Sequence, residues 1–262
     1  DIGLIMARRM TLQGAKVLAC VELMPYSSGL NRNIVQCLQD YNIPLYLSHT
    51  VTDIRGRDRV EGVTVSKVDE NRRPIPGTEM EFECDTLLLS VGLIPENELS
   101  IGAGVALSPL TSGAVVDDSL QTSVPGIFAC GNVLHVHDLV DHVSNESFKA
   151  GQAAADYVRG VERRGDLIAV KDGPGVRGAV PQQVRVEKGG PHAAIDIMFR
   201  PDRVYQNRYI VVTADGKPVF SQKKMILAPG EMADITLTEK HLAACEGAKV
   251  IEVSITEEKP AV

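Results

Sequence analysis

The chain has 262 residues, of which 44% are hydrophobic and 23% are charged, and its formal net charge is −7 at pH 7. This composition is typical of a globular protein long enough for two or three domains. No run of Lys and Arg stands out, so we expect no nucleic acid partner. No apolar stretch approaches the roughly 20 residues that cross a bilayer, so we expect no membrane span.

The cysteines are widely spaced and contain no Cys-x-x-Cys pair. Their odd number and wide spacing argue against a disulfide framework, and no Cys/His metal spacing is present. The sequence therefore predicts a reduced, cytoplasmic protein. The five cysteines are Cys20, Cys37, Cys84, Cys130 and Cys245.

The first residues are typical of the middle of a domain, because the chain begins with Asp rather than Met. The apolar pattern of residues 4–12 predicts a short amphipathic helix that ends near Gly14. Residues 16–21 predict a buried strand that ends at Glu22. We therefore expect a fragment whose N-terminal part lies outside this sequence.

This order of elements fits the second half of a dinucleotide-binding βαβ unit. In such a unit, a glycine-rich turn opens a helix that holds the pyrophosphate, and an acidic residue roughly 20 positions later binds the ribose hydroxyls. Gly3 is the candidate last glycine of the turn, and Glu22 follows it by 19 residues. No Arg follows Glu22 before Arg32, which favours NAD over NADP. The alternative is an ordinary helix and strand that end in a surface Glu.

Further elements are predicted before residue 93. Residues 85–91 are rich in Leu and predict a buried strand that ends at Gly92. The other predicted elements are a helix at 30–41, a strand at 44–47, and two antiparallel strands at 60–68 and 79–84.

The segment from Cys84 to Asn97 reads Cys-Asp-Thr-Leu-Leu-Leu-Ser-Val-Gly-Leu-Ile-Pro-Glu-Asn. It resembles the second crossover motif of the pyridine nucleotide-disulfide oxidoreductases, which are flavoproteins with two dinucleotide-binding domains. In that family, a strand ends in a small-small-Gly turn because the backbone passes close to the nicotinamide side of the cofactor. Ser90, Val91 and Gly92 match this turn, with Ser and Val replacing the commoner Ala and Thr.

A second segment resembles the distal FAD motif of the same family. Residues 113–117 lead to Thr122-Ser-Val-Pro-Gly-Ile-Phe-Ala-Cys-Gly-Asn, after which a helix is predicted. The resemblance implies that the turn from Gly126 through Gly131 and Asn132 brings backbone N–H groups to the FAD phosphates and ribityl chain. The family usually has Asp where this chain has Asn132, which can still accept a hydrogen bond from a ribityl hydroxyl. The alternative is a plain strand-turn-helix connection.

The most chemically dense stretch is Leu134-His-Val-His-Asp-Leu-Val-Asp-His. Its histidines lack the His-x-x-x-His spacing of a helical zinc pair, so we predict no metal site. In the family it resembles, this segment begins the helix that faces the flavin, which implies that Asp141, His142 and Val143 lie near the flavin N1 and C2 carbonyl. His142 is the candidate catalytic residue, because it would donate there and stabilise the reduced anion. The alternative is a set of surface polar residues that cap the helix.

The C-terminal part is rich in short strand patterns. Asp215-Gly216 predicts a hairpin, and residues 239–245 predict a short helix or a turn. Short strands with turns every 8 to 12 residues predict a small immunoglobulin-like sandwich. We expect it to contact a partner subunit, because the catalytic His-Glu pair of the family's usual dimerisation domain is absent. The predicted strands are at 183–186, 194–199, 209–213, 219–224, 233–237 and 249–256.

The predicted fold class is α/β, with FAD/NAD(P)-binding Rossmann-like domains, truncated at the N-terminus, followed by a small all-β immunoglobulin-like sandwich. We expect a partial NAD-binding domain at residues 1–93 and the C-terminal part of an FAD-binding domain at 94–160. A linker is expected at 161–181 and the β-sandwich at 182–262.

The predicted function is that of an FAD-dependent oxidoreductase that transfers hydride between NAD(P)H and flavin, with the isolated fragment inactive. Its partner would be a small-molecule substrate or a redox protein. The pattern is also similar to flavoprotein subunits that oxidise small amines, opines or glycerol phosphate, so the substrate stays open. The alternative is a catalytically inactive fragment or a scaffold whose β-sandwich binds a partner subunit.

Overall fold

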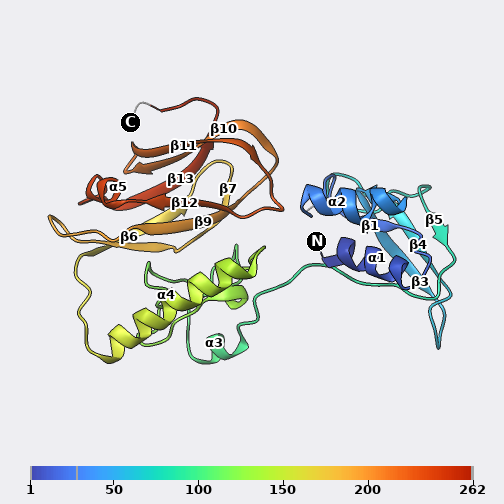
Figure 1. Ribbon diagram of the computed structural model, residues 1–262, viewed down its shortest axis with the longest axis horizontal. Helices are drawn as coiled ribbons and strands as arrows, with labels where there is room; N and C mark the ends of the chain where they lie inside the picture. Colours follow the sequence, from blue (N-terminus) through green and yellow to red (C-terminus); the bar gives the residue numbers. More distant parts are fainter. Residues whose placement is uncertain (1, 28, 261–262) are drawn as a thin grey trace. The chain divides into compact units, whose positions relative to one another are not determined.

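The computed structural model describes residues 2–27 and 29–260. The chain divides between Gly92 and Leu93 into two compact units, which Figure 1 shows in blue to cyan and in green to red. Among the described residues, no helix combines the length and the apolar character needed to cross a membrane.

The first unit begins with helix α1 (Ile2–Leu12) and contains a small parallel pair of strands, β1 (Cys20–Glu22) and β2 (Leu45–Leu47). Helix α2 (Asn31–Cys37) and the 3-10 turn η1 (Gln39–Tyr41) lie between these strands in the chain. The predicted helix at 30–41 is therefore interrupted. One buried apolar cluster of this unit comprises Leu4, Ala7, Cys37, Leu38 and Ile43.

An antiparallel sheet of order β3-β4-β5 completes the first unit. Its strands are β3 (His49–Arg55), β4 (Gly62–Lys67) and β5 (Met80–Phe82). The pairing of Val63 with Phe82 confirms the predicted antiparallel strands at 60–68 and 79–84. Strand β3 was not predicted from the sequence.

The predicted strand at residues 85–91 is wrong. This segment has no regular secondary structure, and Leu88, Leu89 and Val91 are 57%, 71% and 88% exposed. An apolar run becomes a buried strand only when neighbouring strands pair with it and side chains cover both faces. In the described part of the chain, the parallel pair β1-β2 does not extend to this segment.

The second unit contains two sheets that enclose an apolar core. One sheet has the order β11-β10-β13-β6-β8 and the other has the order β12-β9-β7. Pairing is antiparallel except between β13 and β6. The strands are β6 (Asp166–Asp172), β7 (Val176–Val180), β8 (Gln183–Val186), β9 (Ile195–Pro201), β10 (Tyr205–Ala214), β11 (Lys217–Leu227), β12 (Ala233–Leu237) and β13 (Val250–Thr256).

Alternating side chains build this core. Ile197 and Phe199 of β9 and Ile235 and Leu237 of β12 are buried, whereas residues between those of β12 are exposed. The predicted hairpin is confirmed, since β10 pairs with β11 across a turn in which Asp215 and Gly216 both have positive φ. Helix α5 (Glu239–Ala243) follows β12, as the sequence predicts.

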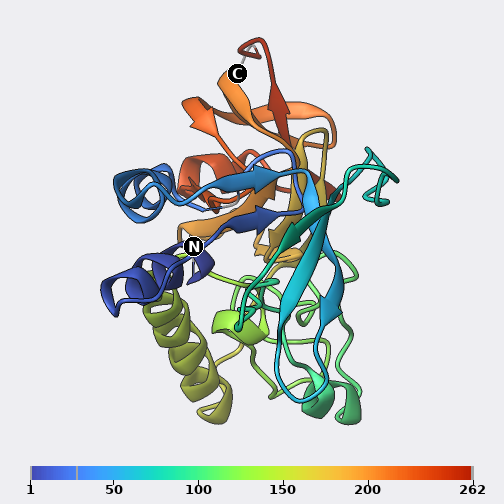
Figure 2. The same cartoon turned by 90° about the vertical axis from the view of Figure 1, so that its right-hand side faces the viewer.

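The first part of the second unit consists mainly of loops around one long helix, α4 (Val140–Val158). Helix α3 (Glu98–Gly102) and the 3-10 turn η2 (Gly131–Val133) precede it. Figures 1 and 2 both show α4 and these loops on one side of the strands. A separate buried cluster holds this part together and includes Val116, Leu120, Leu134, Ala150 and Val180.

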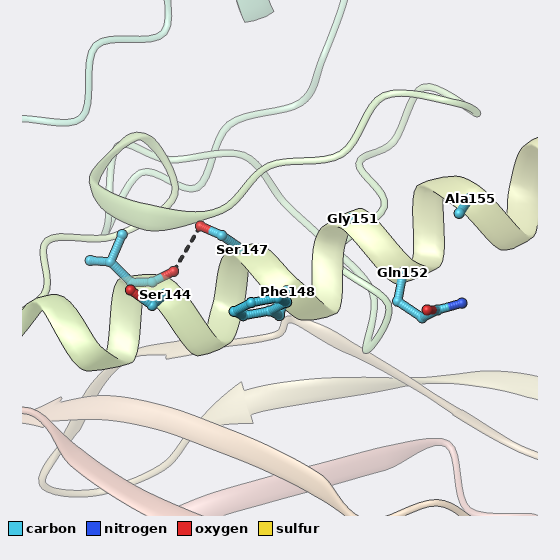
Figure 3. Close-up of a pocket in the computed structure, with 7 residues that line it drawn as sticks. Ser144, Ser147, Phe148, Gly151, Gln152 and Ala155 are labelled. Atoms are coloured by element: carbon cyan, nitrogen blue, oxygen red, sulfur yellow. Dashed lines mark hydrogen bonds between the residues drawn. The ribbon is translucent and has the colours of Figure 1, made fainter.

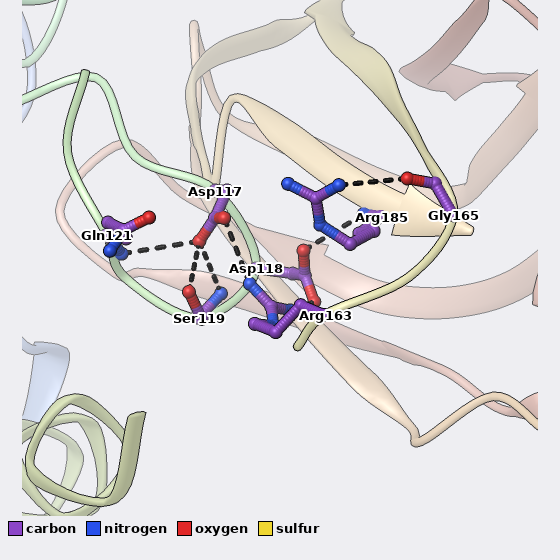
Figure 4. A network of polar contacts seen from close by, with 7 residues as sticks. All are labelled: Asp117, Asp118, Ser119, Gln121, Arg163, Gly165 and Arg185. Atoms are coloured by element: carbon purple, nitrogen blue, oxygen red, sulfur yellow. Dashed lines mark hydrogen bonds and ion pairs between the residues drawn. The ribbon is translucent and has the colours of Figure 1, made fainter. Parts of the chain in front are cut away.

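Residues 161–181, where the sequence predicts a linker, contain strands β6 and β7. A polar network ties this region to the preceding loops (Figure 4). Arg163 lies 2.9 Å from the carboxylate of Asp117 and 2.5 Å from that of Asp118. The other Asp118 oxygen accepts the backbone N–H of Arg185 at 2.9 Å. Burial raises the pKa of Asp118, and the positive charge of Arg163 opposes that rise.

Candidate functional site

The 3-10 turn η2 lies immediately before the histidine-rich segment. Cys130 is extended, and Gly131 has a φ of +70°, a conformation that favours glycine. A Cβ atom on Gly131 would lie 3.2 Å from Cγ1 of Val143, so α4 passes close to the turn. Asn132 and Val133 are exposed on its outer side. The sequence therefore places a glycine where the turn requires one.

Glu146 of α4 is the hub of this region. Its Oε2 atom accepts the backbone N–H of Gly131 at 2.5 Å, and the Nε2 atom of His137 lies 3.0 Å from the same oxygen. The Nε2 atom of His135 lies 2.7 Å from Oε1. The three side chains are only 5%, 1% and 5% exposed for His135, His137 and Glu146. This buried carboxylate joins the turn, the segment after it and the helix.

Glu146 is ionised at neutral pH. Burial raises the pKa of its carboxyl, but the hydrogen bonds from His135, His137 and the Gly131 N–H outweigh burial and lower that pKa to about 2. The site therefore contains a buried negative charge. Among the described residues, its ion-pair partners are His135 and His137, with no Lys or Arg.

Two further contacts fix the turn. The side-chain oxygen of Asn132 accepts the backbone N–H of His137 at 3.1 Å. Buried Asn97, the last residue of the Pro-Glu-Asn sequence, donates through Nδ2 to the carbonyl oxygen of Val133 at 2.9 Å and to that of Ser112 at 3.0 Å. The turn is therefore held by its own Asn132 side chain and by Asn97, which lies 36 residues before Val133 in the chain.

Asp138 points to the strands and not to the histidines. One carboxylate oxygen lies 2.6 Å from Nη2 of Arg200 on β9, and the other accepts the backbone N–H of Met232 at 2.6 Å. The same Arg200 nitrogen donates to the carbonyl oxygen of Val136 at 3.1 Å. These contacts attach the segment before α4 to the all-β part of the same unit.

The predicted flavin-side residues Asp141, His142 and Val143 lie in the first turn of α4. Asp141 is exposed, whereas His142 and Val143 are half-buried. The His142 ring is nearly parallel to the ring of His137, at 6.3 Å between centroids. The structure thus brings Val143 close to Gly131 and His142 close to His137, and it leaves Asp141 in solvent.

A shallow groove runs along the exposed face of α4 (Figure 3). Phe148 is 80% exposed in it, and no atom would lie within 4 Å of a Cβ on Gly151. The hydroxyl of Ser147 donates back to the Val143 carbonyl oxygen at 2.7 Å. The lining residues are Val143, Ser144, Ser147, Phe148, Gly151, Gln152 and Ala155.

The remaining predicted site residues belong to the first unit. Gly3 lies in α1, where a Cβ would be 3.1 Å from Cβ of Ser90. Glu22 ends β1 and accepts the backbone N–H of Met24 at 2.9 Å. Gly92 is exposed and has a φ of +98°. The close approach of α1 to the Ser-Val-Gly segment therefore depends on glycine at position 3.

Asn132 is the exposed polar side chain of this turn, which precedes a 19-residue helix whose N-terminus favours anionic groups. The Gly131 N–H, however, donates inward to Glu146, contrary to the prediction that it faces a cofactor. Any contact from this turn to a phosphate or sugar would have to come from residues other than the Gly131 amide.

Sequence reasoning missed Glu146 as part of the site. The histidines within one stretch lack a zinc spacing, whereas the structure adds a carboxylate from α4 to His135 and His137. One signal was present in the sequence: Glu146 lies four residues before the small residue Ala150 and so shares a helix face with it. A charged residue on a buried helix face calls for a polar partner.

Comparison with known proteins places these features in a family context. Residues 1–156 match the family model described as pyridine nucleotide-disulphide oxidoreductase. The chain is 30% identical over 114 residues to an NADH oxidase of Streptococcus pneumoniae (strain ATCC BAA-255 / R6). The aligned region covers 43% of this chain and 22% of that protein. It is 33% identical over 82 residues to the large subunit of nitrite reductase (NADH) of Escherichia coli (strain K12), covering 31% of this chain and 10% of that one.

A solved structure is similar in fold. Thioredoxin reductase of Lactococcus lactis, in its FR conformation, has a TM-score of 0.52 at 19% identity and covers 62% of this chain and 51% of that chain. The chain thus spans less than a quarter of the two curated relatives and about half of this structure.

Proposed function

Because the chain belongs to the pyridine nucleotide-disulphide oxidoreductase family, we propose that it forms part of an FAD-dependent oxidoreductase that transfers hydride between NAD(P)H and flavin. Members of this family are oxidoreductases that use FAD and NAD(P)H. The observation that carries the proposal is a turn held from inside by Glu146, with Asn132 exposed beside the start of α4.

The residues proposed to hold FAD lie on the outer side of this turn and at the start of α4. Asn132 offers a neutral amide to a ribityl hydroxyl, and Gly131 allows the turn its conformation. The N-terminus of α4 directs positive dipole potential to the flavin, and His142 supplies a hydrogen-bond donor there. The flavin itself would supply the hydride chemistry, while these residues bind and orient it.

The first unit is the proposed site of NAD(P)H binding. Glu22 ends β1, the position at which an acidic side chain accepts ribose hydroxyls in a dinucleotide-binding unit. Gly3 and Gly92 carry no side chain that would obstruct a cofactor. The carboxylate of Glu22 would repel a 2′-phosphate, so NAD is the proposed form.

The all-β part is proposed to be an immunoglobulin-like sandwich that contacts a partner subunit. Support comes from its two mainly antiparallel sheets around one core and from its attachment to the α4 region through Asp138 and Arg200. We also propose a cytoplasmic setting, because the five cysteines are free. The electron acceptor or substrate is a small molecule or a redox protein.

The test is the visible spectrum and FAD affinity of the protein that carries this chain. Asn132→Ala should weaken FAD binding roughly fivefold, the effect of one lost hydrogen bond of about 1 kcal/mol. Asn132→Asp should retain binding, because it keeps the accepting oxygen. Asn71→Ala, in an exposed turn of the first unit, is the matched control. A colourless protein that takes up no added FAD would rule out the proposal and favour a scaffold.

A further inference from the structure

We propose that His135, His137 and Glu146 form a binding site for one divalent transition-metal ion of the zinc class, which holds the η2 turn against α4. The sequence alone predicts no metal here, because the histidines of this stretch lack the spacing of a helical zinc pair. The structure supplies the third side chain from α4, and the three candidate ligand atoms all lie within 4.8 Å of one another. This inference does not depend on the proposed flavin chemistry.

The donor set suits such an ion. Two imidazole nitrogens and one carboxylate oxygen bind Zn²⁺, Fe²⁺ and Co²⁺, whereas Mg²⁺ and Ca²⁺ prefer oxygen ligands. Ligands at zinc distances in a tetrahedron are about 3.3 Å apart. The carboxylate oxygens of Glu146 lie 2.7 Å from His135 Nε2 and 3.0 Å from His137 Nε2. Measured from the nearer carboxylate oxygen, the His137 pair is about 0.3 Å and the His135 pair about 0.6 Å closer than this zinc spacing. Because the three ligand atoms lie within 4.8 Å of one another, small side-chain rotations would bring them around one ion.

The charge at this position also favours a cation. Glu146 is buried, and its ion-pair partners within the described residues are histidines. A buried carboxylate is costly without a compensating positive charge. A divalent ion bound between the carboxylate and the two Nε2 atoms would supply that charge.

The Gly131 N–H then acts as an outer contact of the metal site. It donates to Oε2 of Glu146 and so orients the carboxylate. Because the same glycine begins the η2 turn, an ion bound by Glu146 would fix the turn indirectly. The ligand side chains are at most 5% exposed, which gives substrate no route to the ion and indicates a structural role.

The experiment uses the 262-residue chain, freed of metal with a chelator and titrated with Co²⁺ and then Zn²⁺. We expect one equivalent of Co²⁺ to bind with the visible absorption of a four- or five-coordinate site, and Zn²⁺ to displace it. His137→Gln and Glu146→Gln should each weaken binding by more than about 100-fold, which exceeds the 10- to 100-fold effect of losing an outer contact. Zn²⁺ should raise the melting temperature of the wild type but not of these variants.

The matched control is His192→Gln. His192 also has a buried side chain beside a carboxylate, 3.3 Å from Glu246. Among the described residues, however, it does not belong to a group of three potential metal ligands. This variant should bind like the wild type. Binding that survives in the His137 and Glu146 variants, or is lost equally in the His192 variant, would overturn the proposal.

A measurement on the wild type covers the case in which a variant does not fold. With ¹⁵N-labelled histidine, one equivalent of Zn²⁺ should move the Nε2 resonances of two rings to metal-bound positions. If the folded wild type takes up neither ion stoichiometrically, or if no histidine resonance moves, the proposed site does not exist. Neither readout involves FAD, so this failure would leave the proposed oxidoreductase function untouched.

Discussion

Asp138 and Arg200 join two parts of the second unit that are 62 residues apart in the chain, with 2.6 Å between the carboxylate and the guanidinium. Asp138 lies just before α4, and Arg200 lies on β9 among the strands. The second Asp138 oxygen accepts the Met232 N–H, so the carboxylate contacts two separate segments of the all-β part. The histidine-rich stretch thereby helps to pack α4 against the strands.

Removing this carboxylate should destabilise the second unit. The Asp138 and Arg200 side chains are 20% and 28% exposed, so each is partly shielded from water. Asp138→Ala should lower the free energy of unfolding by about 1–3 kcal/mol, because Arg200 and the Met232 N–H both lose their acceptor. Urea unfolding followed by circular dichroism measures the loss.

A matched control is available in the exposed pair of Arg208 and Glu257. The Glu257 side chain is 78% exposed, and such surface pairs contribute about 0–1 kcal/mol. Glu257→Ala should therefore change the free energy of unfolding little. Equal losses in the Asp138 and Glu257 variants would show that the Asp138 contact is only a surface ion pair.

Glu146 should be more sensitive to substitution than its position in the middle of a helix suggests. Glu146→Gln keeps the size of the side chain but replaces one accepting oxygen by an amide donor, which then faces a histidine or the Gly131 N–H. The free energy of unfolding of the metal-free chain should fall by about 2–4 kcal/mol. Glu98→Gln, on the exposed start of α3, is the control and should have almost no effect. A neutral Glu146→Gln would mean that the carboxylate charge is not needed.

The sequence predicted best those elements whose pattern is local. Strands β8 and β12 lie at the predicted residues 183–186 and 233–237, because alternating apolar side chains report which face is buried. The buried strand predicted at the leucine-rich residues 85–91 is wrong for the converse reason. An apolar run forms a buried strand only where a neighbouring strand pairs with it, and the run itself does not reveal whether that neighbour exists.

In the candidate site too, features set by local sequence were predicted and those set by tertiary contacts were not. Glycine at position 131 was predicted from a motif, and its positive φ agrees with that motif. Glu146 was not selected, because its importance depends on a backbone N–H 15 residues earlier and on two imidazoles that only folding brings together. Asp138 was grouped with the histidines by proximity in sequence, although its partner lies on β9.

Cys245 should remain a protonated thiol at ordinary pH. It is fully buried, and burial raises the pKa of its thiol from 9.0 to about 11. Iodoacetamide at pH 8 should therefore leave Cys245 unmodified in the native protein and label it in urea, as peptide mass spectrometry would show. The half-buried Cys84 should react in the native protein. Rapid native labelling of Cys245 would contradict the burial.

The same thiol makes stability depend on pH in a defined window. An unfolded thiol loses its proton near pH 9, whereas the folded one keeps it until about pH 11, so its contribution is present below pH 9 and is lost as the pH rises to 11. The upper limit of that loss is about 3 kcal/mol. Cys245→Ala should show a smaller fall in the free energy of unfolding between pH 9 and pH 11. Parallel curves for the two proteins would refute this account.

Gly113 tests whether the loop before η2 is packed as tightly as the structure indicates. A Cβ atom at this position would lie 1.7 Å from the carbonyl oxygen of Leu134, a backbone atom that cannot rotate away. Gly113→Ala should therefore cost about 3 kcal/mol or more, since the backbone of the η2 region must shift. Gly102→Ala is the control, because no atom lies within 4 Å of its added Cβ and Ala favours the helix by about 0.5–1 kcal/mol. If Gly113→Ala unfolds at the same urea concentration as the wild type, the η2 turn is not held against this loop. The proposal that the turn presents Asn132 to the flavin in a fixed position would then lose its support.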